Sequence, residues 1–154
     1  APGQIFETSS PAEAIADEVG RRIATSGGAA LIIDYGAEES IGDTFQAIAD
    51  HAFADPLEAP GTVDLTAHVA FGPLARAAAP ARASALTPQG LFLERLGITA
   101  RAQALARGLS GAALDSHIAA HRRLTHGEEM GTLVKAMAPT PGDAPAPPAL
   151  ELAP

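Results

Sequence analysis

The sequence has no cysteine and few aromatic residues, and these absences exclude several kinds of protein. Without cysteine the chain cannot form a disulfide framework, a thiolate metal site or a cysteine nucleophile. Aromatic residues make up 4% of the chain, so the core must be built mainly from leucine, isoleucine, valine and alanine. No run reaches the roughly 18 apolar residues that a membrane-spanning helix needs. What remains is a chain of 154 residues, enough for one domain of ordinary size.

Basic residues are scarce in the first half of the chain. Residues 1–75 contain 12 Asp or Glu and 2 Arg, a net charge of −10, whereas residues 76–154 carry +2. No basic stripe interleaves with aromatic side chains, which disfavours nucleic acid as a partner. The acidic half could attract a basic protein. A solvated surface that keeps the protein soluble explains the same charges.

Several catalytic motifs are also missing. There is neither a G-x-x-x-x-G-K-[ST] loop nor a G-x-G-x-x-G loop. The segment 108–111 lacks the spacing of a nucleophile elbow, which argues against a serine hydrolase. His117 and His121 have the spacing of two metal ligands on a helix, but no zinc-protease glutamate lies between them and no third ligand stands nearby. We therefore assign both histidines to the surface and expect no metal site.

The most informative segment that is present is Ala29–Gly36 (AALIIDYG). Its apolar run without polar alternation predicts a strand covered on both faces, as in a parallel sheet. The preceding segment predicts a helix that begins with a capping box at Ser10–Glu13 and ends at Gly27. This helix–strand order is typical of an α/β fold. Because ligands bind beyond the carboxyl ends of such strands, Asp34 and Tyr35 are candidates to face one.

The other segments predict a mixed set of short elements. The first helix should bury a stripe formed by Ile15, Val19 and Ile23. The further expectations, in chain order, are a strand at 4–8, a long acidic loop at 36–63 with a short helix at 42–48, an extended segment at 64–69, a helix at 73–79, a strand at 82–87, helices at 91–96, 99–107 and 110–125, and a strand at 132–138. We divide the chain into a domain at 1–138, with a helical insertion at about 91–126, and a proline-rich tail at 139–154 that is extended and loosely held.

A set of polar residues falls on the loops expected at the carboxyl ends of strands. Taken singly, each is better explained as a cap or turn residue. Together they predict the rim of an acidic cleft. The set consists of Glu7, Asp34, Tyr35, Asp43, Thr44, Asp64, Thr66, His68 and Gln89.

A series of motifs follows one order along the chain. They are GGAALIIDYG at 27–36, GDT at 42–44, His51, PG at 60–61, DLTAHV at 64–69, QGLFLERLGI at 89–98 and MGTLVK at 130–135. In this order they resemble the MidA-type S-adenosylmethionine-dependent methyltransferases, which include a mitochondrial complex I assembly factor that methylates arginine. The resemblance covers roughly residues 3–138. It departs at Ala70, where the family usually has an aspartate that would cap the next helix, and in length, because members are more than twice as long.

The resemblance implies a fold, a cofactor and an acceptor. The fold is α/β, the C-terminal part of a class I (Rossmann-like) methyltransferase sheet with a helical insertion. The cofactor is S-adenosylmethionine, and the half that binds it is largely absent from this chain, so the fragment alone should be inactive. The acceptor is an arginine on a basic protein, a subunit of respiratory complex I. The carboxylates that would hold the guanidinium and accept its proton are Asp34, Asp43 and Asp64. The residues that would line the acceptor side are Glu7, Tyr35, Thr66, His68 and Gln89.

The partners and the compartment complete these expectations. Half a parallel sheet exposes an apolar strand edge, so we expect a second chain that completes the sheet, or a homodimer. The opening residues predict no signal peptide, and the composition favours the bacterial cytoplasm, with the mitochondrial matrix as the alternative. The alternative function is a non-catalytic assembly or interaction module that binds a basic protein partner.

Overall fold

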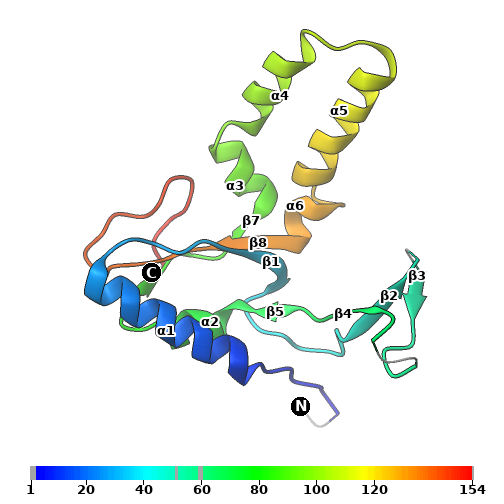
Figure 1. The fold of residues 1–154 in the computed structure, drawn as a ribbon. Helices are drawn as coiled ribbons and strands as arrows, with labels where there is room; N and C mark the ends of the chain where they lie inside the picture. Colours follow the sequence, from blue (N-terminus) through cyan, green and yellow to red (C-terminus); the bar gives the residue numbers. More distant parts are fainter. Residues whose placement is uncertain (1–2, 51, 59–60, 154) are drawn as a thin grey trace.

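The main sheet of the protein contains the strand expected to carry the site. A computed structural model describes residues 3–50, 52–58 and 61–153, so His51 and Pro60 of the resemblance lie outside the described residues (Figure 1). Four strands are arranged in the order β5-β1-β8-β7. Strand β1 pairs in parallel with β5 and antiparallel with β8, which in turn pairs antiparallel with β7. Their bounds are β1 (Ile32–Ala37), β5 (Val69–Ala70), β7 (Thr87–Pro88) and β8 (Val134–Met137).

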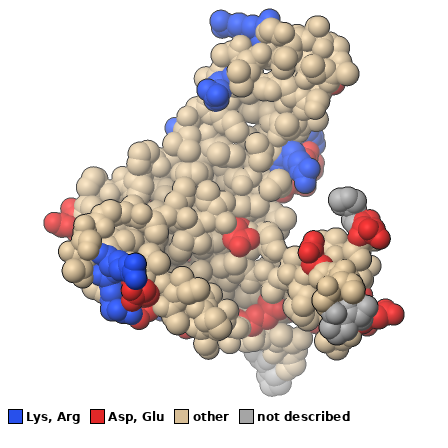
Figure 2. Space-filling view, in the orientation of Figure 1, with Lys and Arg blue, Asp and Glu red and all other residues tan. Residues whose placement is uncertain are grey.

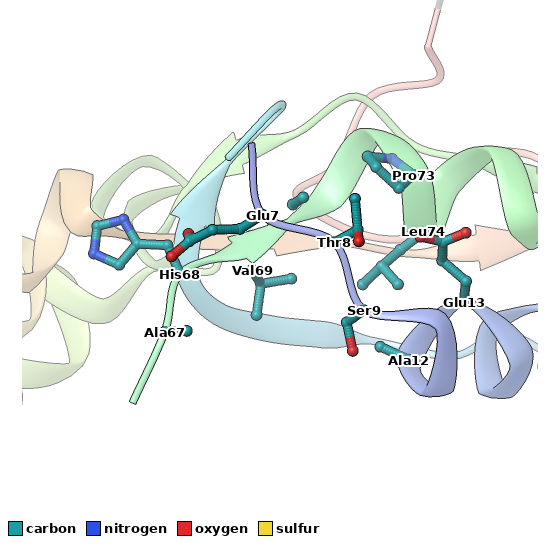
Figure 3. Close-up of a pocket in the computed structure, with 11 residues that line it drawn as sticks. Glu7, Thr8, Ser9, Ala12, Glu13, Ala67, His68, Val69, Pro73 and Leu74 are labelled. Carbon is teal, nitrogen blue, oxygen red and sulfur yellow. The ribbon is translucent and has the colours of Figure 1, made fainter. Parts of the chain in front are cut away.

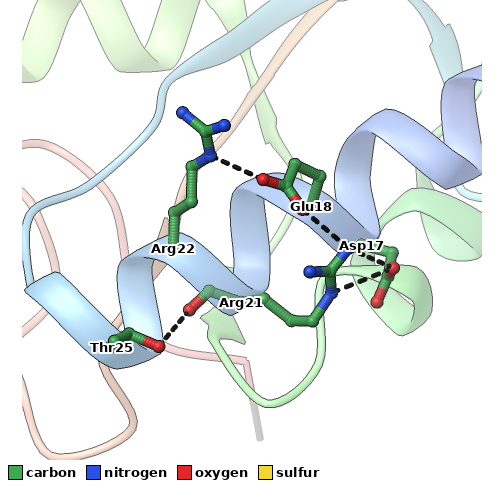
Figure 4. A network of polar contacts seen from close by, with 5 residues as sticks. All are labelled: Asp17, Glu18, Arg21, Arg22 and Thr25. Carbon is green, nitrogen blue, oxygen red and sulfur yellow. Dashed lines mark hydrogen bonds and ion pairs between the residues drawn. The ribbon is translucent and has the colours of Figure 1, made fainter.

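Helix α1 (Ser10–Ser26) has the predicted extent, with a proline in its first turn and Gly27 at its end. The predicted capping box is wrong, because Ser9 is the N-cap and its side chain makes no capping bond. Instead, the Glu13 N–H donates to the Ser9 carbonyl. Exposed ion pairs join Arg21 and Arg22 to carboxylates one turn earlier in the helix (Figure 4). Such exposed pairs contribute little to stability.

The buried face of α1 includes Ile23 of the predicted stripe but not Ile15. Ala16, Gly20 and Ile23 are buried, whereas Ile15 is 66% exposed. The reason is the close approach of the next helix in the layer, α2 (Phe71–Ala77). A Cβ on Gly20 would lie 1.9 Å from the Ala78 carbonyl oxygen. The contact with α2 therefore selects the small residues of α1, and the larger Ile15 faces outward.

Strand β1 begins three residues later than predicted and is not covered on both faces. Ile32 packs on the core cluster of α1 and α2, but Ile33 is 46% exposed on the opposite face. Strand β5 pairs only with Gly36 and Ala37. Along Ile32–Tyr35, the edge opposite β8 has no strand partner within the described residues. This part of β1 is therefore unpaired along one edge and exposed at Ile33 within the described residues.

Two strands from the expected acidic loop at 36–63 pair with one from the predicted extended segment at 64–69 in a second, antiparallel sheet of order β3-β2-β4. Its strands are β2 (Gln46–Ala49), β3 (Ala52–Ala54) and β4 (Asp64–Thr66). The predicted helix at 42–48 is therefore wrong. Side chains alternate along β2, with Ala47 at 1% exposure and Ile48 at 37%, which is the period of a half-covered strand.

Other boundaries also shift. The strand predicted at 4–8 reduces to one bridge between Phe6 and Ile41. The helix predicted at 73–79 begins two residues earlier as α2, where Ala70 is the N-cap and provides no side-chain bond, as the missing aspartate implied. The strand predicted at 82–87 splits into β6 (Arg82–Ala83) and β7, and the strand predicted at 132–138 is shortened to β8 by the short helix α6 (Met130–Leu133).

Three helices form an arm that projects from the sheet (Figure 1). They are α3 (Gln89–Arg95), α4 (Ile98–Ala106) and α5 (Gly111–Thr125), close to the predicted ranges. His117 and His121 are half-buried and face α4, where their Nε2 atoms lie 2.9 Å from the Ala102 carbonyl oxygen and 3.0 Å from the Thr99 hydroxyl. They join the two helices, and no group of three metal-ligating side chains occurs among the described residues.

The proline-rich tail packs against the body, so the expectation that it is loosely held is wrong. Strand β9 (Pro139–Thr140) pairs with β6, and Leu150 is 6% exposed in a cluster with Phe92. Arg95 forms an ion pair with Glu151 at 2.5 Å. Apolar contacts between prolines, Leu150 and the sheet remove surface from water and hold this segment. In the part of the chain that is described, no helix is both long enough and apolar enough to cross a membrane.

Candidate functional site

Glu7 is the carboxylate that the fold surrounds with hydrogen-bond donors. Ser40 Oγ donates to Glu7 Oε2 at 2.6 Å, and the Thr44 N–H donates to Oε1 at 2.9 Å. The Thr44 hydroxyl also donates to Oε2. These bonds, first from Ser40 and then from Thr44, hold the pKa of Glu7 below its usual value of 4.5. Glu7 thereby ties the N-terminal segment to the connection between β1 and β2.

His68 is joined to this network through its backbone. Its N–H donates to the Thr44 hydroxyl oxygen at 2.9 Å. The imidazole lies edge-on to the ring of Tyr35, with centroids 5.8 Å apart and planes at 67°. Tyr35 belongs to β1, and His68 directly precedes β5, so the pairing of these two strands brings the rings together. Glu7, Tyr35 and His68, all predicted for the acceptor side, thus lie in one region.

A pocket of about 220 Å³ lies beside the network (Figure 3). Two carboxylates, Glu7 and Glu13, and the imidazole of His68 are among the side chains that line it. Apolar side chains, among them Val69 and Leu74, form much of the wall. Apolar walls with a few placed polar groups are typical of ligand pockets. A cation on an aliphatic stem, such as an arginine side chain, matches these walls and carboxylates.

The three aspartates predicted as catalytic do not line this pocket. Asp34 lies inside β1 rather than after it, and its Oδ1 accepts the Tyr35 N–H at 2.8 Å. Since successive residues of a strand point to opposite faces, Asp34 and Tyr35 face different sides of the sheet. Asp43 is exposed beside Thr44. Asp64 is exposed at the start of β4, four residues before His68, which is about 13 Å of extended chain.

Two further predicted residues lie apart from the network. Thr66 ends β4 and pairs with Gln46 of the second sheet. Gln89 is 8% exposed, and its Nε2 donates to the Leu124 carbonyl at 2.8 Å, which fastens α3 to α5. It follows β7, three positions from β5 in the sheet order, or about 14 Å at ordinary strand spacing. In this structure Gln89 holds the arm together.

Sequence reasoning missed Ser40, which is 3% exposed and donates to Glu7. It lies in the loop that follows the carboxyl end of β1, so the rule that pointed to Asp34 and Tyr35 would also have included it. The predicted loop at 36–63 includes Ser40, but only the tertiary structure brings its hydroxyl to Glu7.

The network makes stability depend on pH. A depressed pKa in the folded state means that Glu7 contributes stability above pH 4.5 and loses it as pH falls through the lower, folded-state pKa. We therefore expect wild type to melt at a higher temperature than Glu7→Gln at pH 7, and the difference to shrink below pH 4.5. Calorimetric melting of the full-length protein at pH 7, 5, 4 and 3 tests this.

A second variant controls the assignment. Because the Ser40 bond is the main cause of the depressed pKa, Ser40→Ala should reduce the pH-dependent part of the difference. A difference between wild type and Glu7→Gln that stayed constant from pH 7 to pH 3 would contradict the role of this carboxylate.

The chain is similar to proteins of a known family. Residues 1–89 match a family described as "putative S-adenosyl-L-methionine-dependent methyltransferase". The chain belongs to this family. The family's cofactor is S-adenosylmethionine, and the match confirms the resemblance seen in the motifs.

Relatives extend the match beyond residue 89. The human protein arginine methyltransferase NDUFAF7, mitochondrial, is 45% identical over 93 residues, which are 59% of this chain and 21% of that protein. The zebrafish (Danio rerio) protein of the same name is 38% identical over 127 residues, 81% of this chain and 30% of that protein. The chain therefore spans less than a third of these relatives.

The fold is similar to that of two solved structures. A Burkholderia thailandensis crystal structure bound to S-adenosyl-homocysteine aligns with a TM-score of 0.74 at 29% identity, over 92% of this chain and 38% of that chain. A native structure from the same organism gives a TM-score of 0.75. The protein thus has the α/β, Rossmann-like fold of this methyltransferase family, which confirms the predicted fold class.

Parallel strand pairing, the feature next to which α/β sheets form a cofactor crevice, is short in the described residues. Such a crevice lies beyond the carboxyl ends of adjacent parallel strands. Within the described ranges, parallel pairing is confined to Gly36 and Ala37 with Val69 and Ala70. No glycine-rich G-x-G-x-x-G loop is present in the sequence.

Proposed function

We propose that the protein containing this chain transfers a methyl group from S-adenosylmethionine to an arginine of a protein, a subunit of respiratory complex I. The relatives named protein arginine methyltransferase, at 45% and 38% identity, support arginine as the acceptor. The observation that carries the proposal is the pocket in which carboxylates and an imidazole meet apolar walls. Chain outside these 154 residues would hold the cofactor, so the fragment alone is inactive.

The roles of this chain's residues follow from the chemistry of the acceptor. The cofactor supplies an activated methyl group, and the guanidinium nitrogen that receives it must be aligned with that group and lose a proton. Carboxylates hold a planar guanidinium through paired hydrogen bonds and can accept the proton. Asp34, Asp43 and Asp64 stay the predicted catalytic carboxylates. Among the predicted acceptor-side residues, the geometry favours Glu7 and His68, which line the pocket, and Tyr35, whose ring lies against that of His68.

Charge supports a basic protein as the acceptor. The first 75 residues carry a net charge of −10. Acidic side chains are visible at several places on the body of the protein, and basic side chains lie at the end of the helical arm and at the lower left of the body (Figure 2). An acidic surface attracts a basic partner and speeds its association. We propose the bacterial cytoplasm as the compartment, with the mitochondrial matrix as the alternative because the animal relatives are named mitochondrial.

Methyl transfer by the full-length protein tests the proposal. With tritiated S-adenosylmethionine and a peptide that contains a single arginine, we expect label in the peptide and none when lysine replaces that arginine. Asp34→Asn and Asp64→Asn should each reduce transfer by about tenfold or more, since general acid–base and positioning groups have effects of this size. The exposed Asp115→Asn on α5 is the matched control. If both variants methylate as well as wild type, the assignment of these carboxylates is withdrawn.

The acidic half also fits the alternative, a non-catalytic module that binds a basic protein. Calorimetric titration with S-adenosyl-homocysteine separates the two functions. Binding by the intact protein supports the enzyme, whereas absence of binding with a retained protein partner supports the module. For the 154-residue chain alone we expect no measurable binding, and a clear affinity would show that the cofactor site is complete within it.

A further inference from the structure

The hydroxyl of Thr44 links three segments that are distant in the sequence. It donates its proton to Glu7 Oε2 and accepts the N–H of His68 at 2.9 Å. A hydroxyl has one proton, so a single orientation satisfies both partners. Ser40 Oγ donates to the same Glu7 oxygen at 2.6 Å and keeps that carboxylate in place. The polarity of the whole chain of bonds, from Ser40 and Thr44 to Glu7 and from His68 to Thr44, is thereby determined.

His68 needs such an anchor because it belongs to neither neighbouring strand. Strand β4 ends at Thr66 and β5 begins at Val69, so the two residues between them have no strand partner. The bond from the His68 N–H to Thr44 holds the backbone at the point where the chain passes from the second sheet to the main sheet. Tyr35 belongs to strand β1. The backbone position of His68 therefore sets the distance between the His68 ring and the Tyr35 ring.

We propose that Thr44 and Ser40 are positioning residues of the methyl-acceptor site. Thr44 acts through the His68 backbone, and Ser40 acts through the Glu7 carboxylate that orients the Thr44 hydroxyl. Together they hold His68, which lines the pocket, against the ring of Tyr35. The inference rests on the proposed function, because it assigns these two rings to the acceptor side. Loss of the Thr44 hydroxyl leaves the pairing of β4 with β2 and of β5 with β1 intact, so the effect is local.

The experiment compares Thr44→Val, which keeps the shape but removes the hydroxyl, with Thr44→Ser, which keeps the hydroxyl. Thr25→Val on the exposed face of α1 is the matched control. In the full-length protein we expect Thr44→Val to raise KM for the single-arginine peptide about tenfold, the size expected for one lost hydrogen bond in a charged network. The Kd for S-adenosyl-homocysteine should stay unchanged, and Thr44→Ser should restore KM.

A second readout does not depend on the acceptor. The Cε1–H resonance of His68, assigned by its loss in His68→Asn, should shift in Thr44→Val and not in Thr44→Ser or Thr25→Val. If wild type fails to methylate the peptide but this shift occurs, the positioning role of Thr44 is supported and the proposal that arginine is the methyl acceptor is rejected. An unshifted resonance in Thr44→Val overturns the inference, whatever happens to KM. Equal impairment of Thr44→Ser and Thr44→Val, with cofactor affinity lost, also overturns it by showing a role in folding alone.

Discussion

Replacing Gly36 by alanine is expected to destabilise the protein by about 3 kcal/mol, toward the upper end of the range for overpacked sites. A Cβ at this position would lie 2.1 Å from the Val69 carbonyl oxygen, a backbone atom that cannot turn away. Strand β5 pairs with β1 only through Gly36 and Ala37, so a shift of β5 removes half of that pairing. His68 directly precedes β5, and its ring should therefore leave Tyr35.

Chemical unfolding of the full-length protein measures this effect. Gly108→Ala is the matched control, since a Cβ there meets nothing within 4 Å, and its stability should stay within about 1 kcal/mol of wild type. Peptide KM should rise in Gly36→Ala below its melting temperature. Wild-type stability in Gly36→Ala would show that β5 does not approach β1 as closely as the structure has it.

Phe71→Ala should cost about 4 kcal/mol, within the range for truncating a buried phenylalanine. Phe71 is completely buried and forms a cluster with Ala16, Leu74 and Met137 between α1, α2 and the sheet. Aromatic residues are only 4% of the chain, so no second ring is available to fill the cavity. Much of the surrounding volume is alanine, which cannot extend into the space. The two helices beside the pocket should lose their packing together.

Phe53→Ala provides the matched control for this prediction, because Phe53 is 80% exposed and the same atoms are removed. Its free energy of unfolding in urea should change by less than about 0.5 kcal/mol. Should both variants lose equal stability, the core would have to be centred somewhere other than Phe71.

Local signals predicted the helices well. Pro11 in the first turn and Gly27 after the last gave α1 its extent, because proline suits an early helical position and glycine tolerates the positive φ of 76° found there. Gly97 likewise follows α3, and Ser110 precedes α5. These rules depend on neighbours in the chain, which a sequence displays directly. Strand β1 and the ordered family motifs could be predicted for the same reason.

Of the second sheet, the sequence predicted only β4, as part of the extended segment at 64–69. The pairing of β2 with β4 joins Ile48 to Asp64 across 16 residues and Gln46 to Thr66 across 20, and short strands have no strong local signal. The face that α1 buries was also misjudged, because the backbone of Ala78 decides it.

The sequence by itself determined the helices of the arm, the hydrophobic strand β1 and membership of a methyltransferase family, since capping residues, periodicity and ordered motifs are properties of the linear chain. Only the tertiary structure decided which polar side chains meet. Glu7 reaches Ser40 and Thr44 across 33 and 37 residues, and the His68 N–H reaches Thr44 across 24. Hydrogen bonds depend on distances of about 3 Å between atoms. Such distances between remote segments exist only after the sheets and helices have packed.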